Sequence, residues 1–187
     1  VGLFKNGNLE PDEYVLLEGT GGVSTFGLQL AAAAGARPII TSSSNEKLAR
    51  ARELGAVGTV NYRENEDWQV KVRELTDGDG VDHVLEIGGR ETLSKAIEAL
   101  AFEGHIALIG GLTGEAPPIP VGSLVGSGAT ASGIYVGSRA DFQAMNDFIT
   151  KHQMRPVIDR VFSFDEAPAA FEFMQNGSYM GKIVIRH

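Results

Sequence analysis

Short apolar runs alternate along the chain with longer stretches whose apolar residues recur at helical spacing, starting at Tyr14. This alternation is typical of repeated strand–helix–strand units, which build a parallel sheet covered by helices. Strands are expected at residues 14–18, 37–41, 56–62, 82–87, 105–109 and 131–136. Helices are expected at residues 23–34, 47–54, 67–75, 91–101 and 140–152. The pattern therefore predicts an α/β fold with a doubly wound parallel sheet, its six strands in the order 3-2-1-4-5-6.

Three segments depart from this alternation. Residues 112–128 hold three of the seven prolines and several glycines, so we expect an irregular loop there. The chain opens with apolar residues but no helix start signal, which suggests a truncated linker or helix end. Near the C-terminus we expect two short strands with a helix between them, at residues 157–164, 182–186 and 168–175 respectively. The chain is therefore divided into residues 1–13, a sheet domain at 14–152 and a C-terminal segment at 153–187.

Composition narrows the function classes. The 187 residues include 16 Lys and Arg against 24 Asp and Glu, a net charge of −8, which argues against nucleic-acid or anionic membrane partners. With no cysteine, the chain has no disulfide, thiolate metal site or Cys nucleophile. No apolar run approaches the roughly 20 residues of a membrane helix, and nothing suggests a secretion signal. We expect a cytoplasmic protein that acts on a small molecule.

A glycine-rich turn stands between the first predicted strand and the first predicted helix, with the sequence Gly19-Thr20-Gly21-Gly22-Val23-Ser24. In a dinucleotide-binding fold the first glycine permits a sharp turn and the second lets the backbone approach a pyrophosphate. The free amides and positive dipole end of the helix start then favour the anion. Ser24 replaces the third glycine, so the fingerprint is imperfect, and a tight turn without a ligand is the alternative.

The end of the second predicted strand bears on the choice of dinucleotide. An NAD site places a carboxylate there for the ribose 2′-hydroxyl, whereas this chain has Thr41 followed by three serines, with no carboxylate before Glu46. Hydroxyls donate to a 2′-phosphate and Lys47 supplies a compensating charge. We therefore favour NADP(H), with NAD(H) possible. The alternative, which is compatible with phosphate binding, is that the serines cap a helix and Lys47 is solvated.

Five ordered segments together resemble the medium-chain dehydrogenase/reductase superfamily, and most closely its zinc-type alcohol dehydrogenase-like and quinone oxidoreductase-like members. These segments are Gly19–Ser24, Thr41–Leu48, Leu54–Ala56, Gly80–Gly89 and Gly181–Ile185. The resemblance implies a Rossmann-type NAD(P)-binding domain at 14–152 and a C-terminal segment that, in the family, returns to the catalytic domain. The family's N-terminal GroES-like domain, which would also hold most zinc ligands, has no counterpart here.

The same resemblance implies an oxidoreductase that transfers hydride between nicotinamide and a carbonyl, alcohol or activated alkene. We expect the chain alone to be inactive, because no catalytic Ser-His-Asp, Cys-His or metal constellation is visible. The alternative is a non-catalytic nucleotide-binding or redox-sensing module, since a fold alone does not establish function. A methyltransferase is disfavoured because it would need an acidic residue after the second strand.

The resemblance also assigns cofactor contacts. The pyrophosphate would lie against Gly19, Gly21, Gly22 and Val23, with Lys182 reaching toward the phosphates. The 2′-phosphate would meet Ser42, Ser43, Lys47 and Tyr62. The ribose halves would lie over Ile87, Gly88, Ile109, Gly110, Gly111 and Leu112, and the carboxamide would approach Tyr135, Val136 and Gly137.

The remaining predictions concern buried polar residues and assembly. Asp82 and Glu86 share one face of the fourth strand, where solvated strand-edge positions are expected and an acid–base pair is the alternative. His83 and His105 show no metal-ligand spacing and are expected to be structural. The edge strand Ala131–Val136 is little charged, so we expect a homodimer that pairs through it.

Overall fold

The computed structural model describes residues 1–114, 118–119, 121–177 and 179–187. Six strands form one sheet in the order β3-β2-β1-β4-β5-β6, and every neighbouring pair is parallel. The strands are β1 (Tyr14–Leu17), β2 (Arg37–Ser42), β3 (Gly58–Asn61), β4 (Val81–Glu86), β5 (Leu100–Leu108) and β6 (Thr130–Gly133). The strand order and the α/β class predicted from the sequence are confirmed.

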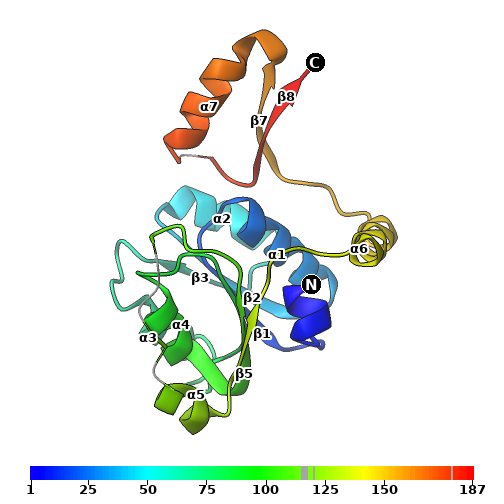
Figure 1. Ribbon diagram of the computed structural model, residues 1–187. Coiled ribbons are helices and arrows are strands. Elements are labelled where there is room, and N and C mark those ends of the chain that lie inside the picture. Colours follow the sequence, from blue (N-terminus) through cyan, green and yellow to red (C-terminus); the bar gives the residue numbers. More distant parts are fainter. Residues whose placement is uncertain (115–117, 120, 178) are drawn as a thin grey trace.

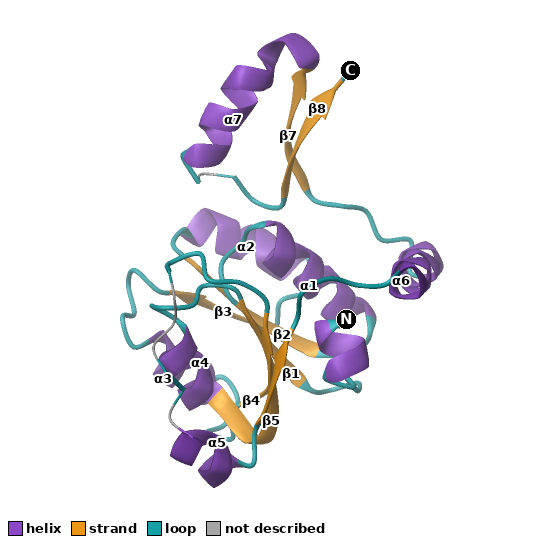
Figure 2. Cartoon of the chain, viewed as in Figure 1, coloured by secondary structure: helices purple, strands orange, loops and turns teal. Residues whose placement is uncertain are grey.

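Helices cover both faces of this sheet (Figures 1 and 2). They are α1 (Gly22–Ala33), α2 (Asn45–Glu53), α3 (Trp68–Glu74), α4 (Leu93–Ala99), α5 (Val121–Ser127) and α6 (Arg139–Lys151). Residues of α1 and α2 pack with Val15 and Leu17 of β1, whereas residues of α3 and α4 pack with Leu16. Because successive strand residues point to opposite faces, the two cores lie on opposite sides of one sheet.

The C-terminal segment forms a separate small unit above the carboxyl ends of the strands (Figure 1). It contains β7 (Ile158–Ser163), the short helix η2 (Phe164–Glu166), α7 (Ala167–Gln175) and β8 (Lys182–Arg186), with β7 and β8 paired in parallel. The amide of Gly181 donates to the carbonyl of Thr20 at 3.0 Å, so this unit contacts the glycine-rich turn. At the other terminus, the π-helix η1 (Gly2–Asn6) packs beside β4 and β5.

Two predicted strand boundaries are wrong by at least three residues, for identifiable reasons. β5 begins at Leu100 because the chain leaves α4 there and pairs with Val81, and an irregularity before His105, with Glu103 at φ +61°, then separates two paired stretches. β6 ends at Gly133 because its partner β5 ends at Leu108, opposite that residue.

Helix α5 occupies part of the segment 112–128 that was expected to be an irregular loop, although residues 115–117 and 120 of that prediction lie outside the described residues. In the described part of the chain, none of the helices has the length and apolar character needed to cross a membrane.

Candidate cofactor-binding site

The glycine-rich turn joins β1 to α1 through a left-handed residue, Gly19, at φ +72°. A side chain is strained at this φ, which explains the glycine. The amide of Gly19 donates to Thr41 Oγ1 at 3.1 Å, and the buried hydroxyl of Ser24 donates to the carbonyl of Glu18. Ser24 therefore fits the position where the fingerprint has its third glycine, and its hydroxyl fastens the helix to the end of the strand.

The start of α1 is open to a ligand. Its N-cap residue, Gly21, provides no side-chain hydrogen bond, and α1 contains no charged residue. A Cβ atom added at Gly19 or Gly21 would meet no atom within 4 Å. The Nζ atom of Lys182 lies 2.7 Å from the place of a Cβ atom on Gly22. Free helix-start amides with a lysine ammonium beside them are a chemical fit for a diphosphate.

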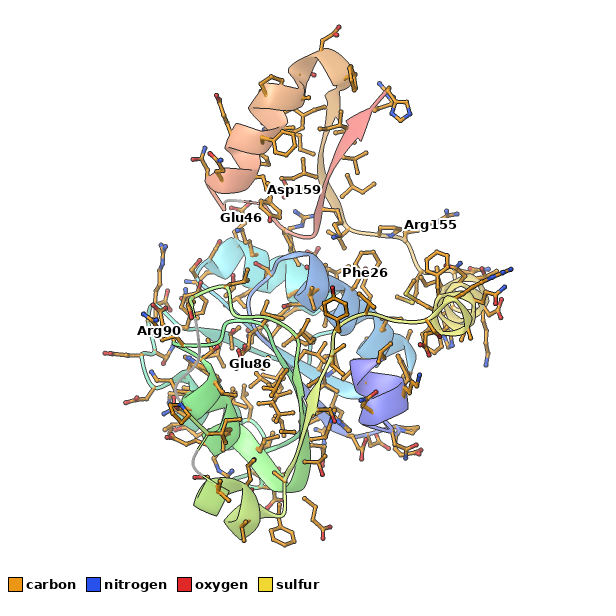
Figure 3. All side chains as sticks on the ribbon, in the orientation of Figure 1. Phe26, Glu46, Glu86, Arg90, Arg155 and Asp159 are labelled. Atoms are coloured by element: carbon orange, nitrogen blue, oxygen red, sulfur yellow. The ribbon has the colours of Figure 1, made fainter. Side chains whose placement is uncertain are left out.

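Hydroxyl groups occupy the end of β2, but they are partly engaged. Ser42 is buried, and its Oγ lies 3.3 Å from Thr20 Oγ1. Ser44 caps α2 by accepting from the amide of Lys47, so the capping interpretation holds for this serine. Ser43, by contrast, is half-buried and hence partly accessible. The exposed Glu46 lies in the first turn of α2 and is labelled in Figure 3.

Lys47 and Tyr62 lie beside this hydroxyl cluster. The ammonium of Lys47 donates to the carbonyl of Gly177 in the C-terminal unit at 3.2 Å. The amide of Tyr62 donates to the carbonyl of Ser42 at 3.1 Å, and its side chain is exposed. The structure therefore gathers the residues predicted for the 2′-phosphate at the ends of β2 and β3.

The turns after β4 and β5 are joined by hydrogen bonds. The amide and hydroxyl of Thr113 both donate to the carbonyl of Gly88, at 2.8 and 2.9 Å, and the amide of Leu112 donates to the carbonyl of Ile87. Gly110, Gly111 and the side chain of Leu112 are exposed along the same loop. These predicted contact residues thus follow adjacent parallel strands, whose carboxyl ends share one edge of the sheet.

An apolar cavity of about 290 Å³ brings together predicted residues from three separate segments. Its lining includes Val23 at the start of α1, Ile109 after β5, and Val136 and Gly137 after β6. Tyr135 does not line it, and the Tyr135 side chain is 96% exposed. The cavity therefore begins beside the glycine turn, at Val23, and follows α1 as far as Leu30.

Glu86 contradicts its prediction. It was expected at a solvated strand edge but is only 1% exposed, because the turn that follows β4 covers it. Its Oε1 atom accepts from the amide of Gly89 and the hydroxyl of Thr92, both at 2.7 Å. Figure 3 shows Glu86 in the interior and Arg90 farther out. Asp82 lies at the opposite end of β4 and accepts from the amide of Tyr14, so the two carboxylates do not form an acid–base pair.

Glu18 is a buried carboxyl group that was not predicted as a site residue. It follows β1 directly, is 4% exposed, and its Oε2 accepts from the amide of Ile87 at 3.3 Å. Burial, followed by the negative charge of Glu86, raises the pKa of Glu18 to about 9. One sequence feature could have identified it, because Glu18 is a glutamate between an apolar strand and the glycine turn.

The histidines lie away from this edge. His83 Nε2 is 2.8 Å from Glu13 Oε2, and the rings of His83 and His105 are 5.9 Å apart in an edge-on arrangement. Among the described residues, no group of three or more His, Asp or Glu side chains could hold a metal ion.

Comparisons with known proteins agree with this geometry. Residues 22–151 match the family model described as zinc-binding dehydrogenase. A zinc-type alcohol dehydrogenase-like protein of Schizosaccharomyces pombe is 41% identical over 191 residues, covering 99% of this chain and 55% of that protein. The chain thus spans about half the length of that curated relative.

Two solved structures share the fold at substantial identity. An NAD-dependent alcohol dehydrogenase superposes with a TM-score of 0.91 at 29% identity, covering 100% of this chain and 54% of that one. A mycobacterial protein in complex with NADPH superposes with a TM-score of 0.84 at 25% identity, covering 99% of this chain and 60% of that one. The chain therefore belongs to the zinc-binding dehydrogenase family of the medium-chain dehydrogenase/reductase superfamily, and it corresponds to the family's dinucleotide-binding half.

Proposed function

We propose that this chain is the cofactor-binding part of an NADP(H)-dependent oxidoreductase that transfers hydride between the nicotinamide and a carbonyl, alcohol or activated alkene of a small molecule. The observation that carries the proposal is the open start of α1, with its uncapped amides and with Lys182 beside Gly22. A diphosphate would bind there, held by the backbone of Gly19 and Gly21–Val23. Relatives solved with or described as using nicotinamide dinucleotides support this cofactor class.

The preference for NADP(H) rests on the chemistry at the ends of β2 and β3. Ser43, Lys47 and Tyr62 offer a hydroxyl, an ammonium and a phenol, while Ser42 is buried at the end of β2. No described carboxylate hydrogen-bonds to these four residues, so a ribose 2′-phosphate meets donors. Lys47 would exchange its bond to the carbonyl of Gly177 for a charge-assisted bond to the phosphate.

The other half of the dinucleotide would extend past the turns after β4 and β5. Gly88 and the loop 109–112 would support its riboses, and the apolar cavity at Val23, Ile109 and Val136 would receive the nicotinamide region near Gly137. The bound cofactor supplies the hydride, and this chain's residues bind it, orient it and exclude water. We expect no turnover by the chain alone, because the residues that select and polarise the substrate are not among these positions.

Calorimetric titration of the 187-residue chain with NADPH and NADH tests this function. We expect NADPH to bind at least about tenfold more tightly, equivalent to about 1.4 kcal/mol. Lys47→Glu should weaken NADPH binding far more than NADH binding, because the new carboxylate repels only the extra phosphate. Lys71→Glu, on the exposed surface of α3, is the control that should leave both affinities unchanged. Equal losses of both cofactors in Lys47→Glu would remove the 2′-phosphate assignment, and absence of binding by the folded chain would remove the function.

The proposal extends to assembly. β6 pairs only with β5 among the described strands, so its outer side has unpaired backbone groups suited to a second copy. The predicted homodimer would form through this edge, which is shorter than expected from the sequence. Sedimentation should show a dimer for the native chain and a monomer for Ala131→Pro. A monomer at high concentration in the native chain would exclude the dimer.

A cytoplasmic location stays a prediction, which cell fractionation checks.

A further inference from the structure

Two buried carboxyl groups lie opposite each other where β1 and β4 end. β1 and β4 are neighbours, with Leu17 opposite Leu85, so the next residues along the two strands, Glu18 and Glu86, are also opposite. Their exposed fractions are 4% and 1%. The strand ends carry the two turns assigned above to the dinucleotide, so the pair lies at the base of the proposed site.

Each carboxyl group uses one oxygen to hold the backbone of the turn after β4. Glu18 Oε2 accepts from the amide of Ile87, and Glu86 Oε1 accepts from the amide of Gly89 and the hydroxyl of Thr92. The other oxygens, Glu18 Oε1 and Glu86 Oε2, are buried without a hydrogen-bond partner among the described residues. Two buried carboxylate oxygens without donors are costly, and a proton between them removes that cost.

Among the described residues, no salt bridge joins either carboxyl group to a cation. Helix α1 contains no charged residue, and β2 presents the hydroxyls of Thr41 and Ser42. On the β5 side, the residue paired with Glu86 is Leu108. The cations at this edge include Lys182, beside Gly22, together with Lys47 and the exposed Arg90. Burial and the neighbouring negative charge hold the pKa of Glu18 far above its ordinary value, in agreement with the unpartnered oxygens.

We propose that Glu18 and Glu86 act as one acid pair with a single shared proton, and that this pair positions the 87–89 turn against the glycine turn to receive the dinucleotide. The backbone of Glu18 is already fixed to the glycine turn, because its carbonyl accepts from Ser24 Oγ. Its side chain then reaches across to Ile87. The inference rests on the proposed function, and it adds a pair of positioning residues beneath the cofactor rather than further contacts to it.

Loss of the shared proton should separate the two turns. Above the pKa of Glu18 the two carboxylates repel each other. The amides of Ile87 and Gly89, which donate to them, then move apart. Glu18→Gln replaces the proton with a permanent donor, because the amide nitrogen can bond to Glu86 while the amide oxygen still accepts from Ile87. Glu86→Gln gives the same result from the other side. Both variants should therefore be insensitive to alkaline pH.

The test is NADPH affinity from about pH 7 to about pH 10, measured for the native 187-residue chain and for Glu18→Gln, with Glu86→Gln as the second variant. The control is Glu74→Gln, an exposed carboxylate on α3. Native and control chains should lose at least about tenfold in affinity over this range, and both pair variants should lose less than about threefold. Deprotonation of lysines affects all four chains alike, so the difference between pair variants and control carries the result. Parallel profiles in all four would overturn the proposal.

A measurement without cofactor separates this inference from the proposed function. The amide resonance of Gly89 should titrate at alkaline pH in the native chain and stay constant in Glu18→Gln. If it does not titrate in the native chain, the positioning role is wrong whatever the cofactor does. If it titrates as expected but NADPH does not bind at any pH, the proposed function is what fails, and the pair positions a turn that receives no dinucleotide.

Discussion

Two pairs of buried titratable side chains lie on the central strands, one toward each end. Glu18 follows β1 directly and Glu86 ends β4, while His83 lies nearer the amino end of β4, paired with His105 of β5. In both pairs burial disfavours charge: it raises the pKa of Glu18, and together with His83 it lowers the pKa of His105. The same physical effect therefore acts at both ends of the sheet.

The difference lies in what covers each pair. The acids hold amides of a turn that borders an open helix start. The histidines lie under the N-terminal segment, where a Cβ atom added to Gly7 would be 2.9 Å from Nδ1 of either ring. A change of charge on Glu18 can therefore alter a ligand site, whereas a change of charge on His105 can alter only packing. Buried ionisable groups indicate function when they also hold a surface that a ligand can reach.

The largest expected effect is at the open end. Gly21→Asp should lower NADPH affinity by about a hundredfold, or about 2.7 kcal/mol, because a carboxylate would stand where the diphosphate binds. The backbone of Gly21 is extended at φ −76°, and Asp is a favoured N-cap residue, so thermal stability should be retained or increased. Calorimetry on the variant measures the loss of NADPH affinity, and a melting curve on the same preparation measures its thermal stability. Unchanged affinity would mean that the diphosphate does not bind at α1.

The next effect concerns stability between pH 4.5 and about pH 9. Between the ordinary value of 4.5 and about 9, folded Glu18 keeps a proton that the unfolded chain releases, so its contribution to stability is lost as pH rises through this window. Denaturant unfolding at several pH values should show a decline of about 1 kcal/mol per pH unit that is absent in Glu18→Gln. A native profile with no such decline would show that the carboxyl ionises normally.

A smaller effect of the opposite sign is expected from the histidine pair. Because the folded pKa of His105 is lowered from 6.5, the unfolded chain takes up the proton first and stability falls as pH drops below that value. His105→Phe keeps an aromatic ring but cannot be protonated, so it should reduce the loss of stability at acidic pH. NADPH affinity measured at neutral pH should be unaffected. A change in affinity would break the distinction between the two ends.

The smallest effect is expected from an exposed pair. Lys71 and Glu74 form a 2.7 Å ion pair on the surface of α3. Lys71→Met should change the free energy of unfolding by less than about 0.5 kcal/mol, because solvent screens the charges. A loss of several times that size would show that an ion pair can stabilise the fold strongly without burial, which would contradict the role given to burial above.

The sequence was sufficient for features that repeat or that follow from backbone rules. Alternation of apolar runs predicted the strand order, and the glycines around Gly19 predicted the sharp turn between β1 and α1. Burial of Glu86 could not be predicted, because strand periodicity gives the face of a residue but not whether a later turn covers it. The early start of β5 depended on pairing with Val81 across a backbone irregularity, which is a tertiary property.

The attachment of the C-terminal unit to the glycine turn has a consequence for sequence variation. The bond from the amide of Gly181 to the carbonyl of Thr20 uses main-chain atoms only, so it imposes no chemical identity on either side chain. Gly181 itself is constrained, since its φ is +77° and a Cβ atom there would collide with the carbonyl of Val157. The anchor therefore depends on glycine at position 181 and not on the side chain at position 20, whose hydroxyl is constrained separately by Ser42.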